Sequence, residues 1–212
     1  PDQESPDLCS CLFTMTTFNV KMLPVDPSSY NLIIMDRFVL FWDGWPSQWL
    51  LCDMVIDDVQ YNCCEQWMMA EKARVFKDDY SLYAILASKT PREQKALGRK
   101  VRGFDPALWD SVCRGIVYAG NLAKFSQNSA LQRVLLATGD RIIVEASPVD
   151  PIWGIGLHQD DLRAQDPAQW RGTNWLGVAI MQVRETLKRQ SQNLPPLLDP
   201  ELQNQLDNRK NL

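Results

Sequence analysis

The chain has 212 residues, of which 45% are hydrophobic and 23% are charged, and it carries a formal net charge of −4. This length and apolar content suffice for one domain with its own core plus additional terminal segments. The acidic balance argues against tight, non-specific binding of nucleic acid, which requires many basic side chains facing phosphates, but it leaves room for a nucleotide or one modified base in a local basic pocket.

The cysteine and histidine content argues against a metal or redox centre. Six cysteines lie at positions 9, 11, 52, 63, 64 and 113, and none of them forms the CxxC spacing of a zinc or redox site. His158 is the single histidine, so soft metal ligands are scarce. We therefore expect reduced thiols that mostly fill the core, no bound metal and no cofactor.

No membrane or export segment is apparent. No stretch approaches the roughly 18 consecutive apolar residues of a membrane span. Residues 1–20 lack the basic start and the apolar core of a signal peptide. The sequence therefore predicts a cytoplasmic, intracellular protein with no membrane partner.

The first predicted elements are an extension and two strands. Residues 1–36 are punctuated by prolines and predict an irregular N-terminal extension. Residues 37–42 (RFVLFW) are typical of a short buried strand. A second strand is expected over residues 50–57, ending in a turn at Asp57-Asp58.

Helices are predicted next. Asn62 is a favourable N-cap and Glu65 stands three residues later, which predicts a helix to about Phe76. A second helix is expected over residues 80–87. Residues 90–93 (TPRE) form a complete helix start, with a cap, a proline at the first position and a glutamate at the third.

The remaining elements complete the chain. In order, we expect a helix opened by Asp105-Pro106 and reaching about Ser126, a helix from Ser129 to Gly139, a strand over 141–146, a long loop over 147–174, a helix over 175–190, and a polar, flexible or loosely docked tail over 191–212.

Glu65 and Lys72 are the first candidates for chemistry. On a helical wheel both lie within the apolar stripe of their helix, while most of the polar residues occupy the opposite face. A buried charge costs several kcal/mol unless it is paired, so these side chains are expected to meet each other, another charge or a lined cavity. Two alternatives stay open, because Glu65 also fits a capping-box bond to Asn62 and Lys72 also fits a snorkelling side chain at the core edge.

Asp150 and Trp153 are the second candidates. They stand three residues apart in a glycine-containing loop directly after a strand, where catalytic groups are often held. The alternative is an ordinary turn in which Trp153 covers the core.

Trp109 and several cations complete the candidates. Trp109 shares a helix face with Cys113 and Ile116, which fits core packing as well as a pocket wall. Lys124 and the basic run 99–102, which includes Arg99 and Arg102, fit either a phosphate or a solvated surface.

Other chemistries find no support. The sequence contains no GxSxG elbow, no P-loop and no dinucleotide-binding glycine fingerprint. A cysteine–histidine enzyme would have only His158 as its base.

Short motifs follow one another through most of the chain. They are EQWMMAEKA at 65–73, LGR at 97–99, FDPALW at 104–109, NLAKF at 121–125, LLATG at 135–139, VEAS at 144–147, DPIWGIG at 150–156, GTNWLG at 172–177 and MQVR at 181–184. In this order and at these spacings the chain resembles the YbiA-like or NADAR family over about residues 41–189.

The resemblance implies a fold and a domain organisation. It implies an α+β fold that is mainly helical, as a single YbiA-like domain with a few short strands over residues 37–190. Residues 1–36 would then be an N-terminal extension and residues 191–212 a polar C-terminal tail.

The resemblance also implies a function and a set of site residues. Members of the family are metal-independent N-glycosidases, so we expect removal of ADP-ribose from ADP-ribosylated guanine in a nucleoside, DNA or RNA. The alternatives are hydrolysis of phosphorylated riboflavin-biosynthesis intermediates and non-catalytic binding of an ADP-ribose-type ligand. Glu65 and Asp150 would be the catalytic acids. The expected substrate-binding residues, including the cations considered above, are Trp109, Trp153, Lys72, Asn174, Gly154, Arg99 and Lys124.

The chain departs from the family in three places. Many relatives carry Ser-Asn-Phe where this sequence has Ser47-Gln48-Trp49, which puts the substrate contact from this loop in doubt. The loop over 156–174 is longer than in small bacterial members and is expected to cap the pocket or to read a larger substrate. The N-terminal extension has no obvious counterpart.

Overall fold

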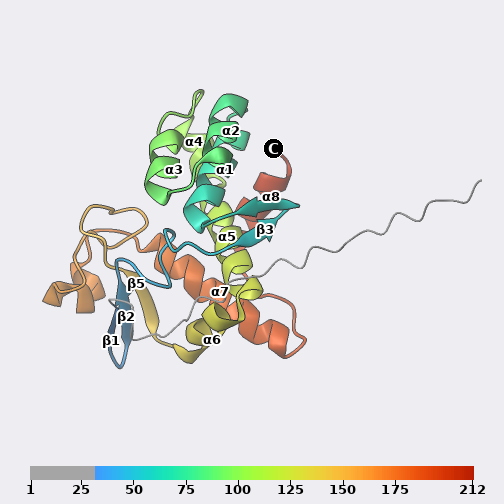
Figure 1. Cartoon of the computed structure of the whole chain (residues 1–212). Helices are drawn as coiled ribbons and strands as arrows, with labels where there is room; N and C mark the ends of the chain where they lie inside the picture. The colour runs from blue at the N-terminus through green and yellow to red at the C-terminus, as the bar shows by residue number, and fades with distance from the viewer. Residues whose placement is uncertain (1–31) are drawn as a thin grey trace, which may run out of the picture.

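A computed structural model describes residues 32–212 of the chain (Figure 1). A small sheet has the strand order β1-β2-β5, formed by Ile33–Ile34, Phe38–Phe41 and Ile142–Glu145. β1 is antiparallel to β2, whereas β2 is parallel to β5 and places Phe41 opposite Glu145. The two longer strands lie within the predicted ranges 37–42 and 141–146.

A separate hairpin precedes the first helix. Its strands are β3 (Met54–Ile56) and β4 (Val59–Tyr61). Asp57 and Asp58 both take left-handed backbone angles, with φ of 51° and 61°. Aspartate tolerates this region, and two such residues form the turn whose twist matches a two-residue hairpin. The turn predicted at Asp57-Asp58 is therefore confirmed.

Helices make up most of the fold, which confirms the prediction of a mainly helical α+β domain. They are α1 (Cys64–Val75), α2 (Asp79–Ala87), α3 (Pro91–Gly98), α4 (Pro106–Asp110), α5 (Cys113–Gln127), α6 (Ser129–Ala137), α7 (Trp175–Ser191) and α8 (Pro200–Lys210), with two short 3₁₀ turns at Leu162–Gln165 and Pro167–Gln169. None of the helices within residues 32–212 is long and apolar enough to cross a bilayer.

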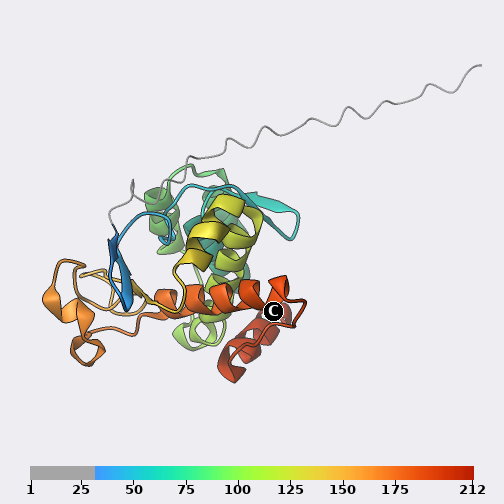
Figure 2. The ribbon, with the colours of Figure 1, turned by 90° about the horizontal axis from the view of Figure 1, so that it is seen from below.

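Alternation along the strands divides the buried side chains between two cores. Val39 and Phe41 of β2 point into the main core, which α1, α5 and α7 cover, whereas Phe38 and Leu40 point into a smaller core on the other face. The long loop after β5 covers this second face and lies beside the sheet in Figures 1 and 2. The sheet is thus buried on both sides, which explains the continuously apolar sequence of β2.

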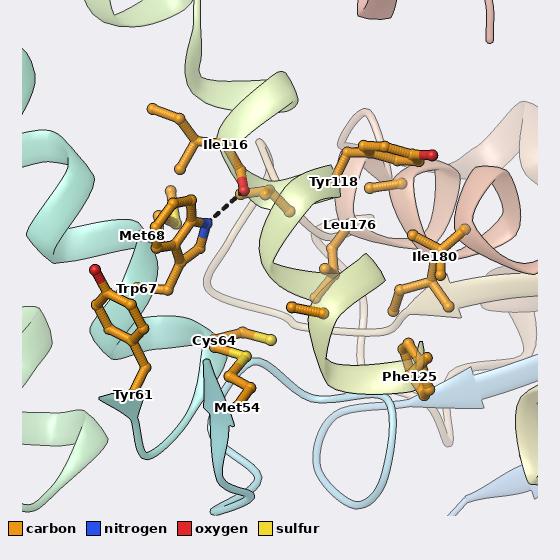
Figure 3. Close-up of a cluster of buried hydrophobic side chains, with 14 of the residues drawn as sticks. Met54, Tyr61, Cys64, Trp67, Met68, Ile116, Tyr118, Phe125, Leu176 and Ile180 are labelled. Atoms are coloured by element: carbon orange, nitrogen blue, oxygen red, sulfur yellow. Dashed lines mark hydrogen bonds between the residues drawn. The ribbon is translucent and has the colours of Figure 1, made fainter. Parts of the chain in front are cut away.

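α5 lies at the centre of the main core. Trp67 of α1 is fully buried against it and donates a hydrogen bond from Nε1 to the carbonyl of Ile116 at 2.7 Å (Figure 3). A Cβ atom on Gly120 would stand 2.4 Å from the Trp67 ring, so glycine is required for this close approach. The packing fixes the position of α1, the helix that carries Glu65 and Lys72.

The start of α1 differs from the prediction by one residue. Its N-cap is Cys63, whose sulfur accepts a hydrogen bond from the Gln66 backbone N–H, and the Gln66 side chain accepts one from the N–H of Asn62. The capping interpretation of Glu65 is therefore wrong, because Gln66 provides the reciprocal bond. The Glu65 carboxyl is left available for another role.

The helix predicted from Asp105 to Ser126 is two helices. α4 ends at Asp110, and Val112, with φ of −135°, separates it from α5. The free N–H groups of Arg114 and Gly115 at the start of α5 donate to the side-chain oxygen of Gln205 in α8. A contact across about 90 residues of sequence thus caps the new helix, and no local signal indicates it.

Part of the C-terminal tail forms a helix that packs against the domain. α8 begins at the cap Asp199, which is followed by Pro200, and it packs against α5 with Leu202 buried. Arg209 of α8 forms an ion pair of 2.5 Å with the buried carboxylate of Glu71 in α1. The interpretation of residues 191–212 as a loose tail is therefore wrong over α8, although the Asp-Pro cap was a readable helix signal.

Replacing Arg209→Ala is expected to lower the free energy of unfolding by about 2 kcal/mol, because the buried Glu71 would keep only Arg74 as its partner. Urea titrations followed by circular dichroism measure the change. Lys210→Ala removes an exposed cation from the next position of the same helix and serves as the control. Equal urea midpoints for the two variants would show that α8 is not held by this ion pair.

Candidate active site

Glu65 lies at the second residue of α1 and is 5% exposed. Its Oε2 accepts a hydrogen bond of 3.2 Å from the indole Nε1 of Trp49, and its backbone N–H donates to the carbonyl of Gln48. Burial raises the pKa of Glu65 and the charge of Asp150 adds to the rise, whereas Lys95, the Trp49 hydrogen bond and Arg99 lower it. An inward-facing carboxyl is therefore surrounded by charged groups from other parts of the chain.

Glu145, at the end of β5, is a second, partly buried acid that the sequence did not single out. Its pKa is raised to about 8, mainly by burial and also by the charges of Asp150 and Glu65, while Lys95 lowers it. Its Oε2 is buried and has no hydrogen-bond partner among the described residues. Glu65, Glu145 and Asp150 thus form an acidic cluster in which Glu145 holds its proton at neutral pH.

Asp150 both forms a turn and belongs to the acidic cluster, which are the two alternatives that the sequence left open. Its Oδ1 accepts hydrogen bonds from the backbone N–H groups of Ile152 and Trp153, at 3.0 and 2.9 Å, and so forms a turn. Its charge also acts on both Glu65 and Glu145. The turn therefore holds one carboxyl oxygen and leaves the other for the cluster.

Gly154 and Asn174 lie behind the cluster and are both buried. A Cβ on Gly154 would stand 2.7 Å from the carbonyl oxygen of Glu145, so glycine lets the loop fold onto the end of β5. The Asn174 amide accepts from the Glu145 N–H at 3.0 Å and donates to the Ile143 carbonyl at 2.9 Å. Both residues were predicted to contact substrate, but the structure places them where they fix the main chain of Glu145.

The cations near the cluster come from α3 and its C-terminal end, and the loop before β3 adds an indole N–H. Lys95 stands 5.8 Å from the centre of the Trp49 ring, and its charge acts on both Glu65 and Glu145. Arg99 is exposed at the end of α3, and its charge also reaches Glu65. Trp49 is 41% exposed while its N–H binds Glu65. Sequence reasoning missed Lys95 and treated Trp49 only as a departure from the family.

An aromatic cleft with a volume of about 520 Å³ lies between α4 and the loop that leads into α7. Its lining includes Phe104, Trp109, Asp110, Trp153, Thr173 and Trp175. Trp153 and Trp175 meet edge to face with ring centres 5.8 Å apart. Because Trp153 also belongs to the turn of Asp150, that turn joins the cleft to the acidic cluster.

Lys72 lies at the edge of the aromatic cleft. Its Nζ stands 4.2 Å from the ring centre of Phe104 and 5.7 Å from that of Trp109. Burial lowers the pKa of Lys72. The structure thus brings Lys72 and Trp109 together, and no anionic partner occupies the ammonium group among the described residues.

Two further predicted phosphate ligands have other partners. Lys124 is fully buried, and its Nζ donates a hydrogen bond of 2.8 Å to the carbonyl of Ser47. It therefore anchors the loop that carries Trp49 and does not face solvent. Arg102 pairs with Asp78 at 2.5 Å, and its side-chain hydrogen bond to Asp78 is the main cause of the lowered pKa of that carboxyl.

The cysteines within residues 32–212 are all buried and free. Burial raises the pKa of Cys63 to about 12 and that of Cys113 to about 11, so both thiols stay protonated and unreactive at neutral pH. Their positions fit the core-filling role expected from the sequence. Cys9 and Cys11 lie outside the described residues.

Known proteins are similar to this chain in sequence and in fold. A family model described as the NADAR domain matches residues 7–188. The chain is 44% identical over 126 residues to N-glycosidase R617 of Acanthamoeba polyphaga mimivirus, covering 59% of this chain and 74% of that protein. It is 34% identical over 133 residues to N-glycosidase Npun_R5314 of Nostoc punctiforme, covering 63% and 78%. The NMR structure of Escherichia coli YbiA matches with a TM-score of 0.63 at 24% identity, covering 76% of this chain and 90% of that one, which shows a shared fold.

Proposed function

Because the chain belongs to the NADAR domain family, as its match over residues 7–188 shows, we propose that it removes ADP-ribose from ADP-ribosylated guanine in a nucleoside or nucleic acid. The relatives named N-glycosidases indicate a hydrolase of the glycosidase class. The observation that carries the proposal is the buried carboxyl of Glu65, bonded to an indole N–H and set in an acidic cluster beside an aromatic cleft.

Glu65 supplies the central electrostatic effect. Breaking the bond between C1″ of the ribose and the nitrogen of the base builds positive charge on the sugar, as in other glycoside hydrolysis. A carboxylate held beneath the ring stabilises this charge, and its burial strengthens the attraction. Lys95 and the Trp49 N–H favour the ionised form of Glu65, which is the form this role requires.

Asp150 and the aromatic cleft position the water and the substrate. The oxygen of Asp150 that the turn does not use binds the attacking water or a ribose hydroxyl. Trp109 and Trp153 stack on the base and hold the reacting atoms in line. Lys72 at the cleft edge and Arg99 at the end of α3 are the cations that face the phosphates.

A panel of substrates tests the proposal. The chain is incubated with ADP-ribosyl-guanosine, with DNA carrying ADP-ribosylated guanine and with phosphorylated riboflavin-pathway intermediates, and the products are identified by mass spectrometry. We expect free ADP-ribose together with the unmodified guanine group. Cleavage of the riboflavin intermediates alone would favour that alternative substrate, and calorimetric binding without release of base would favour a non-catalytic binder.

The hydrogen bond from Trp49 to Glu65 predicts a pH effect. The bond favours the ionised form, so Trp49→Phe raises the pKa of Glu65 and moves the acidic side of the pH–rate profile to higher pH. The variant is expected to lose more activity at pH 5 than at pH 7.5, because a larger fraction of Glu65 is protonated at the lower pH. Trp42→Phe, at an exposed tryptophan that meets His158 edge to face, is the control. If the pH–rate profiles of Trp49→Phe and wild type superimposed, the Trp49 hydrogen bond would not control the ionisation of Glu65.

A further inference from the structure

The main chain of Glu145 is held on both sides. Its N–H donates to Asn174, and its carbonyl accepts a hydrogen bond of 3.0 Å from the N–H of Ile155. Parallel pairing with Phe41 of β2 fixes the same residue within the sheet. Because the carbonyl also packs against Gly154, the residue has little freedom to shift. This rigidity is typical of a group that must be presented in one orientation.

The carboxyl that this frame holds has no polar partner. Its Oε2 is buried without a hydrogen bond among residues 32–212. A buried, unsatisfied polar atom normally costs about 1–3 kcal/mol, so native structures contain few of them. The charged groups whose influence on it is resolved are Asp150 in the following loop, Lys95 in α3 and Glu65 in α1. An orphaned oxygen on a carboxyl that feels these three charges indicates a partner supplied by the substrate.

The environments of the two glutamates differ in the way that a glycosidase requires. Burial raises the pKa of Glu65, but Lys95, the Trp49 N–H and Arg99 oppose this rise and favour the carboxylate. Glu145 has no donor, and burial raises its pKa to about 8, which favours the neutral acid. A carboxyl with donors that favour its charge, beside one that has none, divides the roles of base and acid.

We propose that Glu145 is the proton donor to the departing base, an inference that rests on the proposed N-glycosidase function. A guanine nitrogen leaves poorly with a negative charge, and protonation removes that charge. The C1″–N bond breaks with its electron pair going to nitrogen, while the carboxyl of Glu145 gives its proton to the base. Water then adds to C1″ and loses a proton to the Asp150 carboxylate. Glu145 regains a proton from solvent, and Asp150 releases one, so the cycle balances.

The variant Glu145→Gln tests the assignment because the amide keeps the shape of the neutral acid and cannot donate the proton. With ADP-ribosyl-guanosine, kcat is expected to fall about 10²–10⁴-fold at pH 7 while KM changes little. The wild-type rate is expected to fall above about pH 8, where Glu145 ionises, and the residual rate of the variant is expected to lack this fall. Glu185→Gln, at an exposed acid of α7, should keep both the rate and the profile of wild type.

Stability gives a readout independent of turnover. The pKa of Glu145 is higher in the folded chain than in the unfolded one, so the folded state binds the proton more tightly between about pH 4.5 and 8. The contribution of this group to stability is therefore present at acid pH and is lost as the pH rises through 8. Glu145→Gln should thus gain stability relative to wild type between pH 5 and pH 9, measured as the difference in urea midpoint.

The outcomes separate this inference from the proposed function. If wild type releases no base from any substrate, the proposed function fails. If wild type is active and Glu145→Gln stays within about threefold of it with the same basic side of the profile, the donor role fails and the function stands. If the variant does not fold, the profile of wild type decides: an unchanged rate between pH 7 and pH 9.5 overturns the assignment.

Discussion

Glu65→Gln is expected to lower kcat for base release about 10³-fold while KM changes only a few-fold. The amide preserves the size of the side chain and removes the negative charge that the developing positive charge on the ribose requires. The loss falls on the chemical step, because this interaction is strongest in the transition state. Single-turnover kinetics with ADP-ribosyl-guanosine measure the effect.

Glu71→Gln is a matched control for this variant. Glu71 lies on the same helix and is equally buried at 5% exposed, but it pairs with Arg74 and Arg209 and does not belong to the acidic cluster. The control is expected to lose stability and to keep kcat in its folded fraction. If Glu65→Gln retained turnover within a few-fold of wild type, or if Glu71→Gln lost as much, the special role of Glu65 would be wrong.

Trp67→Ala is expected to destabilise the fold by about 3–5 kcal/mol, which corresponds to a fall in melting temperature on the order of 10 °C for a domain of this size. The side chain is 1% exposed, packs edge to face on Tyr61 and donates to the Ile116 carbonyl (Figure 3). Its removal leaves a cavity between α1 and α5 that the rigid approach at Gly120 cannot close. Calorimetry and urea unfolding measure the loss.

Two other tryptophan variants separate packing from binding. Trp67→Phe keeps most of the volume and should recover part of the stability. Trp109→Ala, at a partly buried tryptophan in the wall of the cleft, is expected to cost less stability and to raise KM for the nucleotide substrate. Equal losses of stability in Trp67→Ala and Trp109→Ala would contradict the division between core and cleft tryptophans.

Local signals predicted most of the elements. The cap at Thr90 accepts a hydrogen bond from the N–H of Glu93 as its sequence indicates, and Pro91 opens α3. The break between α4 and α5 was not predictable in this way, because Gln205 of α8 provides the capping oxygen. A tertiary contact therefore sets the boundary between α4 and α5. The caps and turns that depend on neighbouring residues could be predicted from the local sequence.

The candidate site was predictable where a charge broke an apolar pattern. Glu65 stood out on the wheel because a carboxylate within an apolar stripe needs a reason, and the structure buries it beside Asp150 and Lys95. Glu145 gave no such signal, since an acid at the end of a short strand is unremarkable until the loop folds over it. A lysine such as Lys124 is a residue type that often binds phosphate. Only the fold shows that its ammonium group instead donates to the Ser47 carbonyl.

The acidic cluster has a cost in stability that the rest of the fold offsets. Burial and mutual repulsion raise the pKa values of Glu65 and Glu145, so ionising them is less favourable in the folded chain than in the unfolded one. Such local destabilisation is characteristic of functional sites, where charge is placed for chemistry and not for stability.

A crystal structure of Glu65→Gln with intact ADP-ribosyl-guanosine tests the central claim most directly, because the slow variant would trap the uncleaved substrate. We expect C1″ of the ribose to lie within about 3.5 Å of the side chain at position 65. The leaving nitrogen should face Glu145, and the base should lie against Trp109 or Trp153. A substrate whose C1″ lies against another part of the chain, with the side chain at position 65 remote from it, would contradict the account.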